Sequence, residues 1–362
     1  MELLKQMLIF LTNSKFILFA AALSFAIAFY MLIIGGTAIS YQQQTSTKNG
    51  KVFVMYAASL LKTFETSLGP SFEQKTGYKY TGEGRGSVQI ANMIIDGQRR
   101  PDVFVSAGTI PIMKLMMIND SSIAAAKQQQ QLHQPLAQWL VRFASAEMVI
   151  AYSPISQFHL DLDKAKKGEL PWYQILSEPG FKFGRTDPQL DPKGYYTVIA
   201  AKLANIYYND QSIKQRILGQ DRNLKQVFPE ETLNTVLESG QLDAAAAYKH
   251  EAIARGLPYI TLPSQINLAN PAFSDFYKKA SYTLDTGETV YGEPIYFSAT
   301  IPEITVDNLA GAISFIRFLL STSGGHILQN QGLNYIKPII EGQVDKIPFP
   351  IRTIINEIPA PR

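Results

Sequence analysis

The chain has 362 residues, a formal net charge of +3 and 46% hydrophobic residues. Such a chain can bury at least one sizeable core, and its length suits two lobes better than one, so most of it is expected to fold. Lysine and arginine are scattered among aspartate and glutamate, a pattern that does not favour nucleic-acid binding. The absence of cysteine excludes a disulfide framework, a thiolate metal site, a cysteine nucleophile and a lipid-modified cysteine anchor.

The first predicted element is a membrane segment. Residues 16–38 form an uncharged run of about 23 residues, enough for a helix to cross a hydrocarbon core of about 30 Å. Lys5 and Lys15 precede it and residues 40–47 carry no charge, so residues 1–15 are predicted to be cytoplasmic and the bulk of the chain extracytoplasmic. A cleaved signal peptide is the alternative, because small residues near the end of the run could frame a cleavage site. The length of the run favours the single-pass anchor, and either choice places the folded part outside the membrane.

A linker over residues 39–50 leads into alternating strands and helices. The expected elements are a strand at 51–56, a helix from Ser59, a strand at 78–82, a helix at 87–96, a strand at 102–106 and a Met-rich helix from Ile110. This alternation predicts an α/β fold with a mostly parallel, doubly wound sheet.

A second α/β unit follows the first. Its expected elements are strands at 147–152, 181–184, 244–248 and 259–262, and helices at 172–176, 195–208 and 232–238. The strand at 295–301 and the helix at 310–320 look like a return to the first unit. The predicted organisation is therefore lobe 1 over 51–146 and 264–345, lobe 2 over 147–263, and an irregular C-terminal tail over 346–362.

Candidate binding residues lie at the junctions between these elements. In open α/β sheets ligands bind beyond the carboxyl ends of strands, where the N–H groups of helix N-termini favour anions. Ser59 and Ser87 begin helices after strands, Asp191 lies in a turn with two Asp-Pro pairs, Glu230 begins a helix, and Tyr248 ends a strand. Each residue alone also has an ordinary structural explanation as a helix cap, a turn former or a strand end.

The order of these junctions resembles the molybdate/tungstate-binding proteins of ABC importers. The stretch 56–60 (YAASL) is similar to their first anion loop, Gly86-Ser87 to their second, and 101–107 (PDVFVSA) to their third strand. The stretches 172–176 and 182–195 are similar to the tungstate/molybdate branch in particular. The resemblance covers residues from about 51 to 340.

This resemblance implies a two-lobed periplasmic-binding-protein type II fold that captures an oxyanion between its lobes. It implies a monomeric receptor that performs no chemistry, needs no cofactor, and delivers molybdate or tungstate to a permease driven by a separate ATPase. By the family's motifs, Ser59, Ser87 and Tyr248 would bind the oxyanion, and the carboxylates of Asp191 and Glu230 would ligate its molybdenum or tungsten. The family usually has Cys-Gly-Tyr-Arg where this chain has residues 193–196, Lys-Gly-Tyr-Tyr, which leaves local geometry and ion preference open.

The sequence fits other classes of protein less well. None of the four histidines falls in a triad context, and the glycine-rich stretch 82–86 lacks the Gly-Lys-Ser/Thr of a phosphate-binding loop, which disfavours an enzyme. The nearer alternative is a receptor of the same architecture for sulfate, phosphate or a metal cation chelated by Asp191 and Glu230. A structural or adhesive domain would have no reason to keep hydroxyls at successive anion loops.

Overall fold

The computed structural model describes residues 50–117, 135–303 and 307–357. The predicted membrane segment at 16–38 lies outside these residues. Within the described ranges, no helix is long and apolar enough to cross a membrane. Residues 49–362 form one compact unit.

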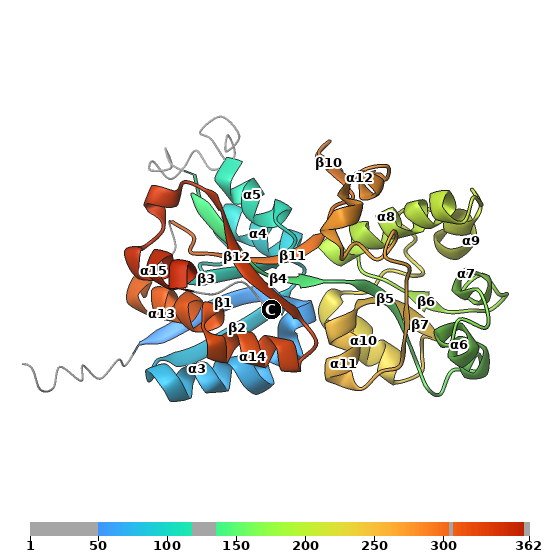
Figure 1. Cartoon of the computed structure of the whole chain (residues 1–362), viewed down its shortest axis with the longest axis horizontal. Helices are drawn as coiled ribbons and strands as arrows, with labels where there is room; N and C mark the ends of the chain where they lie inside the picture. The colour runs from blue at the N-terminus through green and yellow to red at the C-terminus, as the bar shows by residue number, and fades with distance from the viewer. Residues whose placement is uncertain (1–49, 118–134, 304–306, 358–362) are drawn as a thin grey trace, which may run out of the picture. The chain divides into compact units, whose positions relative to one another are not determined.

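Lobe 1 is built on a six-stranded sheet (Figure 1). The strand order is β12-β4-β11-β3-β1-β2. The strands are β1 (Lys51–Ala57), β2 (Lys79–Arg85), β3 (Val103–Ala107), β4 (Trp139–Ala146), β11 (Ile295–Thr300) and β12 (Asn334–Gly342). Apolar side chains of β1 alternate between the two faces, with Val52, Val54 and Tyr56 in one core cluster and Met55 in another. Both faces of this sheet are therefore buried.

Helices cover each face of this sheet. Most apolar residues of α4 and α5 pack with Met55 and Phe104, while α3 and α13 pack against β2 and β1. The helices of lobe 1 are α2 (Leu61–Thr63), α3 (Gly69–Thr76), α4 (Ser87–Ile95), α5 (Ile110–Met117), α13 (Leu309–Leu320), α14 (Thr322–Asn330) and α15 (Phe349–Glu357). A 3-10 turn (Ala58–Leu60) and a π-helical turn (Phe64–Leu68) flank α2.

Lobe 2 is built on a four-stranded sheet of order β6-β7-β5-β8. Its strands are β5 (Met148–Tyr152), β6 (Phe183–Gly184), β7 (Ala244–Tyr248) and β8 (Tyr259–Thr261). Its helices are α6 (His159–Lys166), α7 (Trp172–Ile175), α8 (Pro192–Tyr207), α9 (Ile213–Leu218), α10 (Glu230–Glu238) and α11 (Lys249–Arg255). Between lobe 2 and the return to β11 lie α12 (Ser274–Tyr277) and the hairpin of β9 (Ser281–Thr283) and β10 (Thr289–Tyr291).

Both sheets are mixed, so the expectation of mostly parallel sheets is wrong. In lobe 1, β1 pairs in parallel with β2 and β3, but β11 runs antiparallel to β3 and β4, and β12 antiparallel to β4. In lobe 2, β6 and β7 are parallel, whereas β5 runs antiparallel to β7 and β8. The reason lies in the route of the chain. Parallel neighbours need a crossover connection on the same sheet, but β4 continues into β5 of lobe 2, and β11 comes back from that lobe in the opposite direction.

The C-terminal tail is also more regular than expected. Residues 349–357 form α15, whose Ile351 and Ile355 are buried in the main apolar cluster. The expectation of an irregular extension was based on the prolines near its end. One proline stands at the second position of α15, where its missing N–H costs no helical hydrogen bond.

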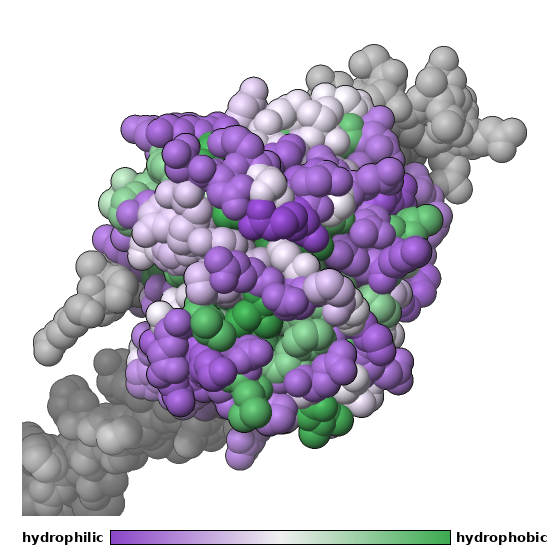
Figure 2. Space-filling view, turned by 90° about the vertical axis from the view of Figure 1, so that its right-hand side faces the viewer, coloured by the Kyte–Doolittle hydropathy of each residue, from purple (hydrophilic) through white to green (hydrophobic). Residues whose placement is uncertain are grey.

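The surface at the end of lobe 2 is largely hydrophilic (Figure 2). Hydrophobic residues on this face form small, separate patches in that view. Scattered apolar side chains of this kind are ordinary on a globular protein.

Candidate anion-binding site

Ser59 enters the site from lobe 1. It lies in the 3-10 turn directly after β1, and its side chain is buried. Its N–H donates to Glu230 Oε1 of lobe 2 at 3.1 Å, while its hydroxyl Oγ is buried without a hydrogen-bond partner. The Ser59 carbonyl oxygen lies 3.2 Å from His250 Nε2, so this turn touches lobe 2 on two sides.

Ser87 is the first residue of α4, at the second strand-to-helix junction of lobe 1. Its buried hydroxyl oxygen accepts the Ala107 N–H at 3.1 Å, which leaves the hydroxyl proton available for donation. The preceding Gly86 lies against lobe 2: a Cβ there would be 2.5 Å from Leu190 O and 3.2 Å from Asp191 Cβ. The start of α4 therefore meets the turn that carries Asp191.

Asp191 is the N-cap of α8. Its Oδ1 accepts the Lys193 N–H at 3.0 Å and the Thr186 hydroxyl at 2.7 Å. Its Oδ2 is buried without a partner. One oxygen thus holds the helix terminus, and the other is left for a ligand.

Glu230 is the first residue of α10. Its Oε1 accepts the Ser59 N–H and lies 3.5 Å from Lys193 Nζ, whereas its Oε2 is buried without a partner. Burial and the neighbouring Asp191 carboxylate raise the pKa of Glu230 well above its ordinary value, and the Lys193 ammonium opposes that rise. The carboxyl groups of Asp191 and Glu230 are therefore close together in a site shielded from solvent.

Tyr248 ends β7 and caps α11. Its ring lies 5.6 Å from Lys193 Nζ, and its hydroxyl is buried without a partner. Burial, together with the charges of Asp191 and Glu230, raises the pKa of this phenol well above its ordinary value. Tyr248 is therefore a neutral hydroxyl donor beside the two carboxylates.

Ser59 thus contacts Glu230 across the lobes, Gly86 next to Ser87 lies against Asp191, and Tyr248 lies near Lys193, the ion-pair partner of Glu230. Four of them present a buried oxygen without a partner: Ser59 Oγ, Asp191 Oδ2, Glu230 Oε2 and Tyr248 Oη. Buried polar atoms normally find hydrogen-bond partners, so four such atoms in one place indicate a ligand site.

Prediction from the sequence missed a buried ion-pair network behind these residues. Lys193 Nζ donates to Glu251 Oε1 at 2.8 Å and Oε2 at 3.0 Å, and Glu251 also accepts from Asn234 Nδ2 at 2.9 Å and from the Tyr248 N–H at 2.8 Å. Burial alone would lower the pKa of Lys193, but the carboxylates of Glu251, Glu230 and Asp191 raise it above its ordinary value. Burial opposes ionisation of Glu251 too, yet Lys193 keeps the pKa of that carboxyl low. The lysine in place of the family's cysteine was the one signal of this network in the sequence.

A cleft of about 310 Å³ opens beside the site. Gly86 and Gln89 of lobe 1 line it on one side, and Asp191 and Glu230 line it on the other. The Gln89 N–H donates to Leu190 O at 3.0 Å, and the Arg85 guanidinium pairs with Glu231 at 2.7 Å across the lobes. The site is thus closed by lobe-to-lobe contacts and reached from this cleft.

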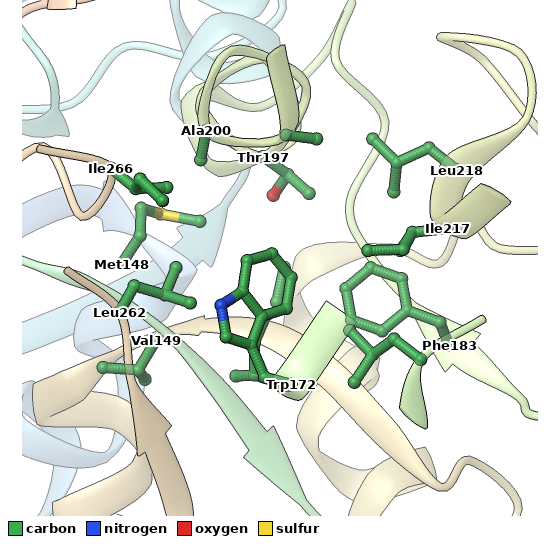
Figure 3. Close-up of a pocket in the computed structure, with 14 residues that line it drawn as sticks. Met148, Val149, Trp172, Phe183, Thr197, Ala200, Ile217, Leu218, Leu262 and Ile266 are labelled. Atoms are coloured by element: carbon green, nitrogen blue, oxygen red, sulfur yellow. The ribbon is translucent and has the colours of Figure 1, made fainter. Parts of the chain in front are cut away.

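A second cavity, in the core of lobe 2, has a different character. It measures about 30 Å³ and is lined almost wholly by apolar side chains, with Trp172 facing Met148, Phe183 and Ile217 (Figure 3). The polar groups on its wall are satisfied, because the Thr197 hydroxyl donates to a backbone carbonyl at 2.6 Å and Trp172 Nε1 to a tyrosine hydroxyl at 3.2 Å. A volume of about one water molecule with no free polar group does not suit an oxyanion.

Comparison with known proteins assigns the family. Residues 52–334 match the bacterial extracellular solute-binding proteins. The chain belongs to this family. It is 31% identical to the molybdate/tungstate-binding protein WtpA of Pyrococcus abyssi over 87% of this chain and 92% of that protein.

Solved structures show the same fold as this solute-binding protein. The periplasmic molybdate-binding protein of Azotobacter vinelandii superimposes with a TM-score of 0.51 at 18% identity, over 78% of this chain and 98% of that one. The sulfate-binding protein SubI of Mycobacterium tuberculosis also gives 0.51, at 14% identity, over 86% and 92%. The shared fold is therefore that of two-lobed periplasmic binding proteins.

A chelated metal cation is poorly matched to this site. Among the residues that the structure describes, no group of three or more His, Cys, Asp or Glu side chains is arranged to hold a metal ion. The Lys193 ammonium, 3.5 Å from Glu230, would also repel a cation.

Proposed function

We propose that this solute-binding protein captures molybdate or tungstate between its lobes outside the cytoplasm and delivers the anion to the permease of an ABC importer. The observation that carries the proposal is the set of four buried oxygens without partners, contributed by both lobes. Two belong to hydroxyls, Ser59 and Tyr248, which can donate to the oxygens of an anion. Two belong to carboxylates, Asp191 and Glu230.

The two carboxylates favour a metal oxyanion over sulfate or phosphate. Like charges in a closed, low-dielectric site repel each other at a cost of several kcal/mol, so carboxylates are poor neighbours for an anion that stays tetrahedral. A carboxylate oxygen is, however, a hard donor that suits hexavalent molybdenum or tungsten, which can accept two more oxygens. Sulfur in sulfate cannot expand its coordination in this way. The relative named as a molybdate/tungstate-binding protein supports the same choice.

Titration calorimetry on the purified full-length chain tests this function. Tungstate and molybdate should each bind with a stoichiometry of one, at least tenfold more tightly than sulfate or phosphate, a difference of at least about 1.4 kcal/mol. A matched control replaces Ser67, a half-buried residue on the π-helical turn of lobe 1, by alanine, and should bind as the unmodified chain does. Equal affinity for all four anions, or a preference for sulfate, would contradict the proposal.

The predicted anchor completes the proposal. The segment at 16–38 would hold the monomeric receptor at the outer surface of the membrane, beside its permease. Intact mass measurement of the protein recovered from membranes tests it: retention of residues 1–38 supports an anchor, and a mature chain starting near residue 39 supports a cleaved signal peptide.

A further inference from the structure

Lys193 lies in the candidate site but is not one of the five residues predicted to bind the anion. It is the second residue of α8, and its side chain is fully buried. An ammonium has three N–H donors. Glu251 takes two hydrogen bonds at 2.8 and 3.0 Å, and Glu230 Oε1 lies 3.5 Å away on the remaining side. Two of the three donors go to Glu251, and the ammonium forms an ion pair with Glu230, so an effect of Lys193 on a bound anion passes through Glu230.

The two oxygens of Glu230 are in different situations because of this contact. Oε1 accepts the Ser59 N–H of lobe 1 at 3.1 Å and forms an ion pair with the Lys193 ammonium of lobe 2 at 3.5 Å. Oε2 is buried and has no partner. A carboxylate held at one oxygen from two directions cannot rotate freely, so Oε2 is aimed in a fixed direction.

Lys193 itself is held in place from behind. Glu251, its main partner, accepts from Asn234 Nδ2 and from the Tyr248 N–H in the capping box of α11. Through Glu251 the ammonium is therefore tied to the middle of α10 and to the start of α11, and cannot follow Glu230 if that side chain moves. A rigid support of this kind is what a binding group needs if its geometry is to be set within a fraction of an ångström.

We propose that Lys193 is the positioning residue that fixes Glu230 Oε1, so that Oε2 points at the metal centre of the bound oxyanion, and that it thereby sets the preference for metal oxyanions over sulfate. This inference rests on the proposed function. Lys193 also supplies a positive charge beside two carboxylates and an incoming dianion, but that charge would favour every dianion alike. If Lys193 acts by positioning Glu230, its loss should weaken tungstate binding more than sulfate binding. If it acts by its charge alone, its loss should weaken both equally.

A double-mutant cycle on the full-length chain separates them. Lys193→Met removes the ammonium and keeps the length of the stem; Glu230→Gln removes the group that Lys193 is inferred to position. In the unmodified background Lys193→Met should weaken tungstate binding at least tenfold, and in the Glu230→Gln background less than threefold. Sulfate affinity should fall much less than tungstate affinity. Lys202→Met, on the same helix, removes a half-buried lysine that donates to Ser281 O at 2.8 Å; it is the matched control and should leave both affinities unchanged.

Three outcomes are decisive. An equal loss of tungstate affinity in both backgrounds, or an equal loss for tungstate and sulfate, would overturn the positioning role and leave the proposed function standing. Failure of the unmodified chain to bind tungstate or molybdate would overturn the proposed function and this inference with it. X-ray absorption at the tungsten edge gives a signature that lost stability alone would not change: the oxygen shell of tungstate bound to Lys193→Met should shrink toward four.

Lys193→Met leaves Glu251 buried without its counter-ion, which destabilises the fold. The same cycle is then run in a Lys193→Met/Glu251→Gln background, which removes both charges of the pair and keeps the acceptor for Asn234. The expected result is unchanged: with Lys193 absent, adding Glu230→Gln should weaken tungstate binding less than threefold. A tenfold or larger further loss would show that Glu230 is positioned without Lys193.

Discussion

Glu230 is the residue at which two modes of anion capture make opposite predictions. If Oε2 ligates tungsten, Glu230→Gln keeps the shape and loses the anionic donor, and tungstate affinity should fall at least tenfold, about 1.4 kcal/mol. If the anion stays tetrahedral, the same change removes a repulsion, and binding should stay equal or become tighter. Calorimetry gives the sign of the change. Glu238→Gln, on the surface at the far end of α10, is the control, and a regular four-oxygen shell at the tungsten edge in the unmodified protein would contradict metal ligation.

Asp191 has two roles that substitution can separate. Asparagine is as good an N-cap as aspartate and keeps the oxygen that accepts from Thr186 and Lys193. Asp191→Asn should therefore change the free energy of unfolding without ligand by less than about 1 kcal/mol and still weaken tungstate binding at least tenfold. Asp191→Ala should lose about 1 kcal/mol of stability as well. Urea unfolding measures the change in stability, and calorimetry measures the change in tungstate affinity. Unchanged affinity in Asp191→Asn would show that Asp191 acts as a helix cap and does not ligate the metal.

At the scale of elements, His250 makes the contact between α11 and the first anion loop sensitive to acid. Burial lowers the pKa of His250 to about 4, with Nε2 3.2 Å from Ser59 O. His250 is therefore protonated near pH 6.5 in the unfolded chain, but only near pH 4 in the folded chain. Stability from this group is fully present above pH 6.5 and is lost as the pH falls toward 4, by up to about 3 kcal/mol.

Urea unfolding between pH 7 and pH 4.5 tests this acid sensitivity. His250→Gln can still donate to Ser59 O but cannot titrate, so its free energy of unfolding should fall less steeply with acid than that of the unmodified chain. His326→Gln, an exposed change on α14, should keep the original slope. Parallel slopes for His250→Gln and the unmodified chain would show that acid acts elsewhere.

Local patterns predicted the elements that carry the site, because those elements are defined by neighbours in sequence. The largely apolar strands β1, β3 and β7 and the serine at the start of α4 lie close to their expected positions. Strand direction was not predictable in the same way, since the antiparallel pairing of β11 depends on where the chain leaves lobe 2. The Lys193–Glu251 pair joins residues 58 positions apart and has no local pattern at all. Only the departure from the family motif at Lys193 marked it.

At the scale of the whole molecule, the structure shows the lobes in contact around the site, and binding should require that contact. The bonds from Ser59 to Glu230 and from Gln89 to Leu190, with the Arg85–Glu231 ion pair, join the lobes at three points. If these contacts form on binding, the ligand draws together residues of both lobes by domain closure. Saturating tungstate should then lower the radius of gyration measured by X-ray scattering.

Gly86 offers a direct test of whether closure and binding are the same event. Its φ of −58° and ψ of 131° are open to any residue, so alanine fits the backbone of lobe 1. A Cβ at this position would, however, stand 2.5 Å from Leu190 O, a backbone atom of lobe 2 that cannot swing away as a side chain can. Gly86→Ala should therefore fold normally, bind tungstate at least tenfold more weakly, and show a smaller ligand-induced decrease in the radius of gyration. Gly325→Ala adds the same methyl inside lobe 1, against the ring of Tyr335, and should bind and close as the unmodified chain does. Full affinity in Gly86→Ala would mean that the anion is held without the close approach of the two lobes at this point.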